Sequence, residues 1–444
     1  MSDHSERARQ WVHIGSSAFA LLLRVLTWPQ AAVLAIAALA CNAFVLPRVG
    51  GHRLYRAADL SRGFPVGILL YPQSVLLLIL FFRSRLDLVA AAWGILAFGD
   101  GFATLVGHQA RGARLPWNRD KSVAGTAAFV IFGAAGGTAL AWWVRPAISP
   151  LPTPTTLVLS TTIAAVVAAF VESVPVRLDD NLSVPFAAGT ILWAASLFDP
   201  AVWSTGRSVV LSVLPWAIAF NTAIAYLGFR AKTVSTSGMI GGWIVGVVIY
   251  AFGGLTAWLL LFLTFVAATL SSRLGLARKL RLGIAEAKGG RRGAGNAFAN
   301  CGVAALAAVL VWTTRYPAES LLALAASLVA GGSDTVASEI GKAWGRRTFL
   351  VTSFARVPSG TPGAMSLEGT LAGVASAALL GAIAIGLQLV GWHALAPIVI
   401  AATIGALVES VLGATLEGPG ILNNDTLNFI NTAVAAVTVL WLAR

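Results

Sequence analysis

The sequence predicts an all-α fold, a polytopic transmembrane helical bundle of about fifteen helices in two related halves. The first observation is composition, because 57% of the residues are hydrophobic and only 11% are charged, against roughly 25% charged residues in soluble domains. The second is that apolar runs of roughly 17–25 residues, enough to cross a bilayer as a helix, recur along the whole chain. These runs lack the alternation of apolar and polar residues that a membrane β-barrel requires.

The expected helices follow from the apolar runs, which short polar or proline-containing segments separate. In chain order, the runs cover residues 12–26, 30–47, 64–82, 87–107, 123–143, 156–173, 185–199, 207–228, 237–252, 255–272, 296–313, 319–340, 367–390, 394–413 and 427–443. With the N-terminus in the cytoplasm, most of the 31 Lys and Arg residues fall in cytoplasmic segments, as the positive-inside rule requires. We therefore expect an integral, multi-pass membrane protein whose polar sites face the cytoplasm.

Charge and cysteine usage narrow the class further. The net charge of +13 reflects membrane orientation and lipid contact, so we expect the lipid bilayer as a partner and no nucleic acid. Cys41 and Cys301 both lie in apolar runs, and we expect neither a disulfide nor a metal site from them. Arg7 and Arg9 precede an apolar run without a small-residue cleavage site, which predicts a retained first helix.

One set of polar signals occurs twice in the same order and defines the two halves. Each copy begins with an aspartate in a small-residue run, crosses a basic loop and re-enters an apolar run through Ser-x-x-Gly-Thr; Glu-Ser and an Asp/Asn cluster follow. The copies are Gly99–Gly107, Lys121–Thr126, Glu172–Ser173 and Asp179–Asn181, and Gly332–Gly341, Ser366–Thr370, Glu409–Ser410 and Asn423–Asp425. We place the junction within Asp199–Arg207, which gives domains 1–203 and 204–444.

Carboxylates inside the spanning runs are the main candidates for function, because an ionisable group there is costly and marks a functional site by default. The simpler alternative for each is a helix-end residue that reaches water at the headgroups. Small residues around Asp100 and Asp334 allow either close helix packing or the approach of a phosphate to backbone N–H groups. The carboxylates concerned are Asp100, Glu172, Asp334, Glu339 and Glu409.

Basic residues in the loops are the expected phosphate contacts, although such loops also satisfy the positive-inside rule by themselves. They are Arg111, Arg114, Arg119, Lys121, Lys288, Arg291, Arg292, Lys342, Arg346, Arg347 and Arg356. Carboxylates that hold Mg²⁺ and cations that contact phosphate oxygens are the groups that phosphoryl transfer needs. A Walker-type G-x-x-x-x-G-K-[ST] sequence is absent, and His13, His52 and His108 are secondary candidates.

The first half resembles the phytol kinase and dolichol kinase family of membrane lipid kinases over most of residues 1–200. The resemblance implies transfer of a phosphate from a nucleoside triphosphate, typically CTP, to a long isoprenoid alcohol. Ala124 departs from the pattern, because relatives often carry Glu there. The matching residues are Gly99–Gly101, Leu115–Asn118, Lys121, Ser122, Gly125, Thr126, Glu172, Asp179–Asn181, Val184 and Pro185, with a weaker match at Arg9 and His13.

The second half is similar to the phytyl-phosphate kinase family of membrane proteins over roughly residues 210–444. Relatives often have Asp where this chain has Glu409. The matching residues are Lys232–Val234, Gly238, Gly241, Gly242, Gly293–Asn300, Ser333–Thr335, Ala337–Gly341, Val357–Thr361, Ser366, Leu367, Gly369, Thr370, Glu409, Ser410 and Leu412–Ala414.

Together the two resemblances imply a bifunctional kinase that converts an isoprenoid alcohol to its monophosphate and then to its diphosphate, with CTP or another nucleoside triphosphate and Mg²⁺ or another divalent cation. In the first site Asp100 and Asp180 are the expected metal ligands, with Glu172 as a further ligand or the base. The first-site binding residues are Arg119, Lys121, Ser122, Gly125 and Asn181. The second site comprises the acids Asp334, Glu339, Glu409 and Asp425, of which Asp334 and Asp425 hold the metal, and the binding residues Arg291, Arg292, Asn296, Asn300, Arg356, Ser366, Gly369 and Asn424.

Three alternatives stay open on the sequence. A membrane cytidylyltransferase that makes a CDP-activated lipid would need the same acids, metal and nucleotide. A secondary transporter would also contain two repeats and intramembrane acids, although transport sites lie near the midplane. In the third alternative one half is only structural, and Ala124 makes the first half the better candidate for that role.

Overall fold

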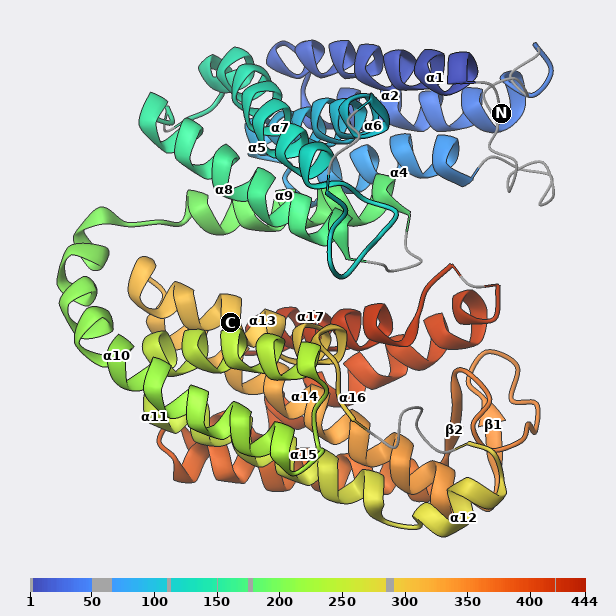
Figure 1. Cartoon of the computed structure of the whole chain (residues 1–444), viewed down its shortest axis with the longest axis vertical. Coiled ribbons are helices and arrows are strands. Elements are labelled where there is room, and N and C mark those ends of the chain that lie inside the picture. The colour runs from blue at the N-terminus through green and yellow to red at the C-terminus, as the bar shows by residue number, and fades with distance from the viewer. Residues whose placement is uncertain are drawn as a thin grey trace. The chain divides into compact units, whose positions relative to one another are not determined.

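The computed structural model describes residues 3–49, 66–109, 113–149, 151–174, 179–284, 291–419 and 421–444. The chain separates into two compact units, Met1–Ser196 and Leu197–Arg444 (Figure 1). Almost all of the regular structure is helical, which confirms the predicted all-α, polytopic membrane fold. A two-stranded antiparallel sheet in the second unit is the exception among the described residues.

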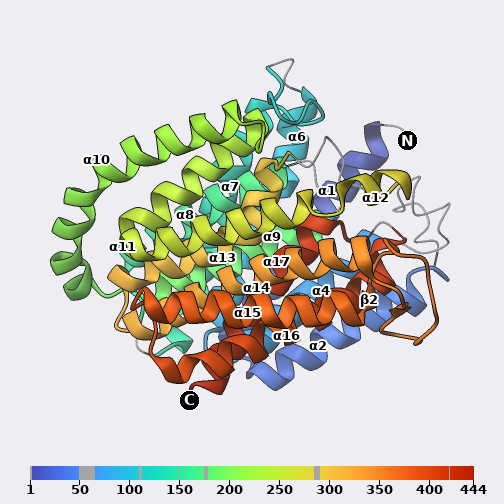
Figure 2. The same ribbon diagram turned by 90° about the horizontal axis from the view of Figure 1, so that it is seen from below.

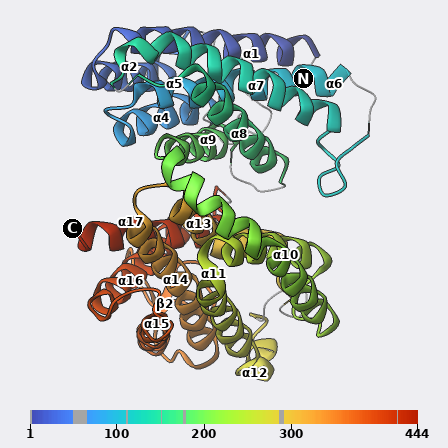
Figure 3. The same ribbon diagram turned by 90° about the vertical axis from the view of Figure 1, so that its left-hand side faces the viewer.

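The first unit is a bundle of helices around α5. Its elements are α1 (Asp3–Ser16), the 3₁₀ helix η1 (Ser17–Arg24), α2 (Trp28–Ala40), the π-helix η2 (Cys41–Val45), α4 (Val66–Phe81), α5 (Leu86–Gly94), the π-helix η4 (Ile95–Asp100), α6 (Gly101–Gln109), α7 (Val123–Val144), η5 (Arg145–Ala147), α8 (Pro154–Ser173) and α9 (Asp180–Ser196). Nearly every residue of α5 is buried, because α5 packs against α7, α9 and η1. Helices α8 and α9 lie side by side (Figure 3).

The second unit is organised around α14 (Pro317–Trp344). Its other elements are α10 (Pro200–Arg230), α11 (Thr236–Arg273), α12 (Leu276–Arg281), α13 (Ala294–Thr313), β1 (Thr348–Leu350), β2 (Ala364–Ser366), α15 (Leu367–Gly386), η7 (Trp392–Ala394), α16 (Leu395–Leu412), the π-helix η8 (Gly413–Glu417) and α17 (Asn424–Leu442). Helix α14 packs against α11, α13, α15, α16 and α17, and Figure 2 shows α15 directly beside it. Strands β1 and β2 pair antiparallel, with Thr348 opposite Ser366.

Small residues hold α14 in this position. The helix buries Ala323, Ala325, Ala326 and Ala330, and Gly331 lies against Asn300 of α13. Lipid is as apolar as a protein core, so burial of apolar area drives helix association in a membrane only weakly, and close packing of small side chains replaces it. The alanine- and glycine-rich composition of α14 therefore fits a helix surrounded by other helices.

Eleven helices in the described part of the chain are long and apolar enough to cross a membrane. The sequence predicted about fifteen membrane-spanning helices, and three features of the structure explain why fewer helices reach that length. The first run is divided between α1 and η1, and α4 and α9 are 16 and 17 residues long. The runs 237–252 and 255–272 form one element, α11, whose helical backbone is interrupted at Gly254 with φ 81° and ψ 178°. Glycine adopts this conformation at little cost.

Candidate functional site

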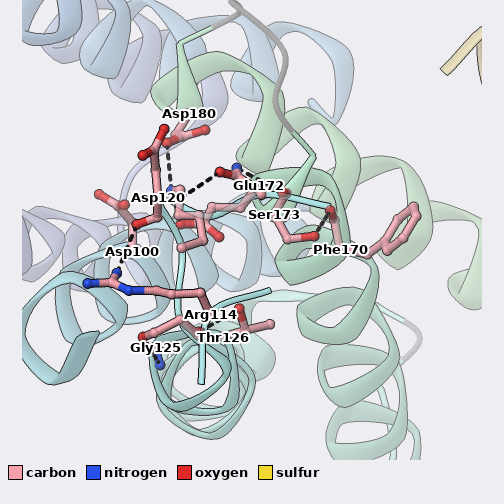
Figure 4. A network of polar contacts seen from close by, with 12 residues as sticks. Asp100, Arg114, Asp120, Gly125, Thr126, Phe170, Glu172, Ser173 and Asp180 are labelled. Carbon is pink, nitrogen blue, oxygen red and sulfur yellow. Dashed lines mark hydrogen bonds and ion pairs between the residues drawn. The ribbon is translucent and has the colours of Figure 1, made fainter. Parts of the chain in front are cut away.

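Three carboxylates from separate helices meet in the first unit. Asp100 is the last residue of the π-helix η4, Glu172 lies one residue before the end of α8, and Asp180 is the first residue of α9. One carboxylate oxygen from each lies within 4.8 Å of the other two. Figure 4 shows the three side chains gathered at these helix ends. Within the described residues, this is the one group of three or more Asp, Glu, His or Cys side chains with the spacing of a metal site.

The loop before α7 positions the end of α8 that carries Glu172. The Asn118 side-chain amide donates to the carbonyl oxygen of Ser173 at 3.0 Å, and the Trp117 indole N–H donates to the Ser173 hydroxyl at 3.2 Å. The Ser173 hydroxyl in turn donates to the carbonyl oxygen of Phe170 (Figure 4). The Leu-Pro-Trp-Asn segment therefore has a structural role, because its Trp117 and Asn118 side chains bind the end of the helix that carries Glu172.

Lys121 lies among the carboxylates. Its ammonium group forms an ion pair with Glu172 and approaches Asp180 Oδ2 at 3.5 Å. Burial favours the neutral amine, but the charges of Asp180 and Glu172 outweigh it and raise the pKa of Lys121 above its ordinary value. Lys121 is therefore a fixed cation at neutral pH, and it occupies the position from which an ammonium group can meet an incoming anionic ligand.

His13 joins the site from α1, although the sequence ranked it as secondary. Its Nε2 atom lies 3.7 Å from Asp100 Oδ2, and its ring packs edge-on against Tyr71 with centroids 4.6 Å apart. The Tyr71 hydroxyl accepts hydrogen bonds from Ser16 at 3.0 Å and from the Trp93 indole at 2.7 Å. The weak family match at His13 was the signal for this contact, because no spacing rule connects α1 to Asp100.

The two Ser-x-x-Gly-Thr motifs have the same structural role. Ser122 caps the N-terminus of α7 by accepting from the Gly125 N–H, and Ser366 caps α15 by accepting from the Gly369 N–H, both at 3.1 Å. In each unit the following glycine lies against the preceding small-residue helix, Gly125 on Ala103 and Gly369 on Ala337. These serines and glycines therefore cap and pack helices, which accounts for the motif without a ligand, and their predicted role in substrate binding stays a prediction.

Replacement of Gly369 by alanine is expected to destabilise the second unit. A Cβ atom at this position would lie 2.7 Å from the Ala337 carbonyl oxygen, so a backbone must move, and such overpacking typically costs about 1–3 kcal/mol. The thermal unfolding midpoint of purified Gly369→Ala in detergent should therefore fall. Gly386→Ala is the matched control on the same helix, because nothing lies within 4 Å of a Cβ there. Equal midpoints for the two variants would contradict the close-packing role.

The glycines beside Asp100 are also used in packing. A Cβ at Gly99 would lie 2.8 Å from the Phe129 ring, and one at Gly107 would lie 3.3 Å from the Ser122 hydroxyl. The sequence left open whether these small residues serve helix packing or backbone contact with a phosphate. The structure favours packing, because the space beside each glycine is filled by a neighbouring side chain.

The remaining predicted residues of the first site lie on its edge. Arg119 is exposed on the loop before α7. The Asn181 backbone and side-chain N–H groups both donate to Asp179 Oδ1, at 3.0 and 2.8 Å, an arrangement that begins α9 and thereby places Asp180. Arg114 donates to the Asp120 carbonyl oxygen within the same loop (Figure 4). Arg111, Lys288 and His52 lie outside the described residues.

The acids of the second unit do not form a matching cluster. Within the described residues, no three of Asp334, Glu339, Glu409 and Asp425 come as close together as the three acids of the first unit. Asp334 and Glu409 lie close enough to repel each other electrostatically, and Lys342 lies within electrostatic range of Asp334. Asp425 lies against Gly295 at the start of α13. Of the four acids expected in the second site, Asp334 and Glu409 are therefore near each other, and Asp425 lies beside the start of α13.

Glu339 belongs to a buried ion pair that the sequence did not predict. Lys279 of α12 pairs with Glu339, and both side chains are at most 2% exposed. The Lys279 ammonium also donates to the Ser272 carbonyl oxygen at 2.7 Å, and Lys342 approaches Glu339 at 3.4 Å. Because Asp334 and Glu339 are five residues apart, they face different neighbours, and Glu339 joins α14 to α12.

Three of the residues predicted to bind the substrate or nucleotide in the second unit are linked by hydrogen bonds at the start of α13. Arg292 Nη1 donates to Asn296 Oδ1 at 3.2 Å, and the Asn300 amide donates to the Asn296 carbonyl oxygen at 3.0 Å. Arg291, Arg356 and Asn424 are exposed. Asn423, the residue before Asn424, caps α17 by accepting from the Thr426 N–H.

Sequence reasoning missed two buried amides on α17. Asn428 is 8% exposed and Asn431 is 1% exposed, and Asn431 interacts with Glu409. With Asn424 they recur at intervals of four and three residues, which places them on one face of a helix. This spacing was the signal that could have identified them.

The donor set of the first unit fits a divalent cation. Carboxylate oxygens are the ligands that Mg²⁺ prefers, and Asp100, Glu172 and Asp180 bring three of them together. The Lys121 ammonium pairs with two of the same acids, so the cluster already accommodates positive charge. The fold and site define a multi-pass membrane protein with a cluster of three carboxylates at the ends of its helices.

Comparison with known proteins gives the family. Residues 219–436 match the model described as "Integral membrane protein DUF92". The chain is 36% identical over 233 residues to "Uncharacterized membrane protein sll0875" of Synechocystis, covering 51% of this chain and 90% of that protein. It is 34% identical over 266 residues to "Protein VTE6, chloroplastic" of Arabidopsis thaliana, covering 57% and 79%. The chain belongs to this DUF92 family of integral membrane proteins.

A second group of relatives carries an activity in its name. The chain is 34% identical over 125 residues to "Probable phytol kinase 3, chloroplastic" of Glycine max, covering 28% of this chain and 39% of that protein. It therefore spans less than half of that relative. No solved structure is significantly similar to the chain.

Proposed function

We propose that the chain is a bifunctional isoprenoid lipid kinase that uses a nucleoside triphosphate, with CTP as the expected donor, and Mg²⁺. The first unit phosphorylates an isoprenoid alcohol such as phytol, and the second extends the monophosphate to the diphosphate. The observation that carries the proposal is the cluster of Asp100, Glu172 and Asp180 around Lys121. Similarity to proteins named as phytol kinases supports the substrate class.

The first reaction needs groups that the cluster contains. The alcohol oxygen forms a bond to the γ-phosphorus, the bond from that phosphorus to the β–γ bridging oxygen breaks, and a nucleoside diphosphate leaves. The hydroxyl proton passes to a carboxylate of the cluster, and Glu172 is the proposed base if it does not hold the metal. Asp100, Glu172 and Asp180 would hold the divalent cation, which supplies charge neutralisation for the triphosphate. Lys121 is a permanent cation for the phosphate oxygens.

The second reaction has a simpler requirement. Its acceptor is a phosphate that is already anionic, so no base is needed to remove a proton from it. The acceptor oxygen bonds to the γ-phosphorus, and the nucleoside diphosphate again leaves. Asp334 and Glu409 supply the acids, and Lys342 and Arg292 are the expected cations. The residue before Ser366 is Met365, where the first unit has Lys121 before Ser122, so the second unit must take its cation from elsewhere.

Fusion of the two steps has a kinetic consequence. A monophosphate released from the first unit stays anchored in the same bilayer by its isoprenoid tail. Tethering the second site to the first raises the effective concentration of this intermediate. One chain would therefore convert alcohol to diphosphate without accumulation of the monophosphate.

The assay follows from the products. Purified protein in lipid vesicles, with γ-labelled CTP, Mg²⁺ and phytol or geranylgeraniol, is expected to yield labelled mono- and diphosphate and unlabelled CDP. Absence of both labelled lipids beside an active control kinase would overturn the proposal. Release of pyrophosphate with a CDP-activated lipid would identify a cytidylyltransferase, and ion-coupled uptake without nucleotide turnover would identify a transporter. Omission of the metal should abolish both products.

A further inference from the structure

The second unit contains a cavity that the reaction scheme above has not used. Its volume is about 160 Å³, and it lies between α10, both halves of α11, α13 and α14. All of these elements belong to one compact unit. The cavity walls are mainly apolar, with Leu261, Phe262 and Leu328 among the lining side chains.

One end of the cavity is polar and cationic. Arg292, Asn296 and Asn300 line this end, and the hydrogen bond between Arg292 and Asn296 fixes the guanidinium beside α13. Asp425 lies against Gly295, next to this group, and Gly331 and Gly332, which precede Asp334 on α14, also line the cavity. The polar end therefore lies beside Asp425, one of the acids that the sequence predicted for the second site.

A buried hydrogen bond forms another part of the cavity wall. The Trp258 indole donates to Asn221 Oδ1 at 2.8 Å, and both side chains are buried and line the cavity. Gly246 lies against this pair and leaves room for it. The hydrogen bond to the tryptophan satisfies the buried amide oxygen of Asn221 in this part of the wall.

The cavity opens sideways at Gly242. This residue lines the cavity and is also exposed, and nothing lies within 4 Å of a Cβ built on it. Elsewhere on α10 and α11, the helices that carry this part of the cavity wall, Tyr226, Ile240 and Ile244 present exposed apolar side chains. In a helix bundle that spans a membrane, such a surface faces lipid chains, so the opening leads into the bilayer.

We infer that this cavity binds the phosphate-proximal part of an isoprenyl monophosphate, with the rest of the chain leaving beside Gly242 into the membrane. The inference rests on the proposed function and identifies where the acceptor of the second reaction binds. Charge complementarity favours a phosphate headgroup at the polar end, because the Arg292 guanidinium and the side-chain amides of Asn296 and Asn300 would face it. An apolar cavity of about 150 Å³ holds a benzene-sized group, so this one accommodates about one five-carbon isoprene unit.

The size of the cavity predicts the selectivity. The enzyme should distinguish strongly between isoprenyl and other phosphates but weakly between longer isoprenyl chains, because their additional units lie in lipid. Farnesyl and geranylgeranyl phosphate should therefore bind within about threefold of each other, less than one order of magnitude in Kd.

Equilibrium binding of labelled geranylgeranyl phosphate to purified protein, without nucleotide, tests the site. Gly242→Leu should weaken binding by about tenfold or more, because the new side chain fills the opening. Gly386→Leu is the matched control, since Gly386 is exposed, has open space at its Cβ and does not line the cavity. Unchanged binding by monodisperse Gly242→Leu would overturn the inference, as would equal competition by dioleoyl phosphatidic acid.

A second measurement covers the case in which Gly242→Leu fails to fold. Cys301 lines the cavity, and the other cysteine, Cys41, is exposed. In a Cys41→Ser background, geranylgeranyl phosphate should slow modification of Cys301 by methyl methanethiosulfonate, and inorganic phosphate or geranylgeraniol should slow it less. Equal rates with and without the lipid phosphate would overturn the inference. Neither readout needs turnover, so an absence of kinase activity is distinguishable from an absence of binding.

Discussion

Asp100→Asn is expected to abolish formation of isoprenyl monophosphate from the alcohol and to leave diphosphate formation from supplied monophosphate intact. Asp100 is one of three carboxylates that meet within 4.8 Å, and its replacement removes a negative ligand from the proposed cation site while preserving the shape of the side chain. Loss of one preorganised electrostatic partner at a reaction centre costs on the order of a hundredfold to a thousandfold in kcat. The rate of each step, measured with separate substrates, checks the prediction.

Two further variants sharpen this experiment. Asp120→Asn is the matched control, because Asp120 lies on the exposed loop before α7 and outside the carboxylate group. Asp334→Asn should show the reverse pattern, with monophosphate formation retained and diphosphate formation lost. If Asp100→Asn removes both steps with each substrate supplied separately, then the two units do not hold independent sites.

Lys279→Met is expected to be the most destabilising single substitution among those considered. It leaves buried Glu339 with only the longer and partly exposed contact to Lys342 at 3.4 Å, and breaking one side of a buried ion pair typically costs about 3–5 kcal/mol. The lysine and the glutamate are 1% and 2% exposed, so solvent cannot replace the lost partner. Thermal unfolding of the purified variant in detergent should show a large fall in the midpoint, with loss of folded protein on expression at elevated temperature.

The comparison variants separate the ion pair from packing. Lys279→Met combined with Glu339→Gln removes both charges and should recover most of the lost stability, because no uncompensated charge stays buried. Lys342→Met is the comparison, since its side chain is 29% exposed and lies 3.4 Å from Glu339, so its loss should lower the unfolding midpoint less than the loss of Lys279. A double variant as unstable as Lys279→Met would show that the lysine acts through packing and through its bonds to backbone carbonyl groups.

The fold was predictable because membrane helices carry their signal locally. Each apolar run is long enough to cross the hydrocarbon layer, and a helix satisfies its own backbone hydrogen bonds there. The runs at 237–252 and 255–272 even indicated the break at Gly254, where the structure has φ 81°. What the runs did not reveal is which helix lies at the centre, since α14 and α15 are both rich in alanine and glycine but have different neighbours.

The candidate site was predictable only in part, for reasons that particular residues show. Asp100 and Glu172 were selected because acids are rare in apolar runs, and Asp180 because it lies in an Asp/Asn cluster; each has a counterpart in the second half. Glu339 was also selected as an acid in an apolar run, yet it pairs with Lys279 from another helix. Ser122 and Ser366 stood out by repetition, and their hydroxyl groups cap helices. A repeated pattern identifies a common structure, and it does not distinguish a ligand contact from a helix cap.

The sequence alone determined the membrane class, the helical runs and the set of acids from which a site can be built, because hydrophobicity and the rarity of charge in apolar runs are properties of local composition. Only the tertiary structure decided which acids meet. Asp100 reaches Glu172 and Asp180 because η4 and α8 end, and α9 begins, at one place, whereas in the second unit α14 directs Glu339 toward Lys279 of α12 and away from a shared site. The physical reason is that a cation site needs several oxygens within a few ångströms, and that spacing arises from the packing of helices distant in sequence.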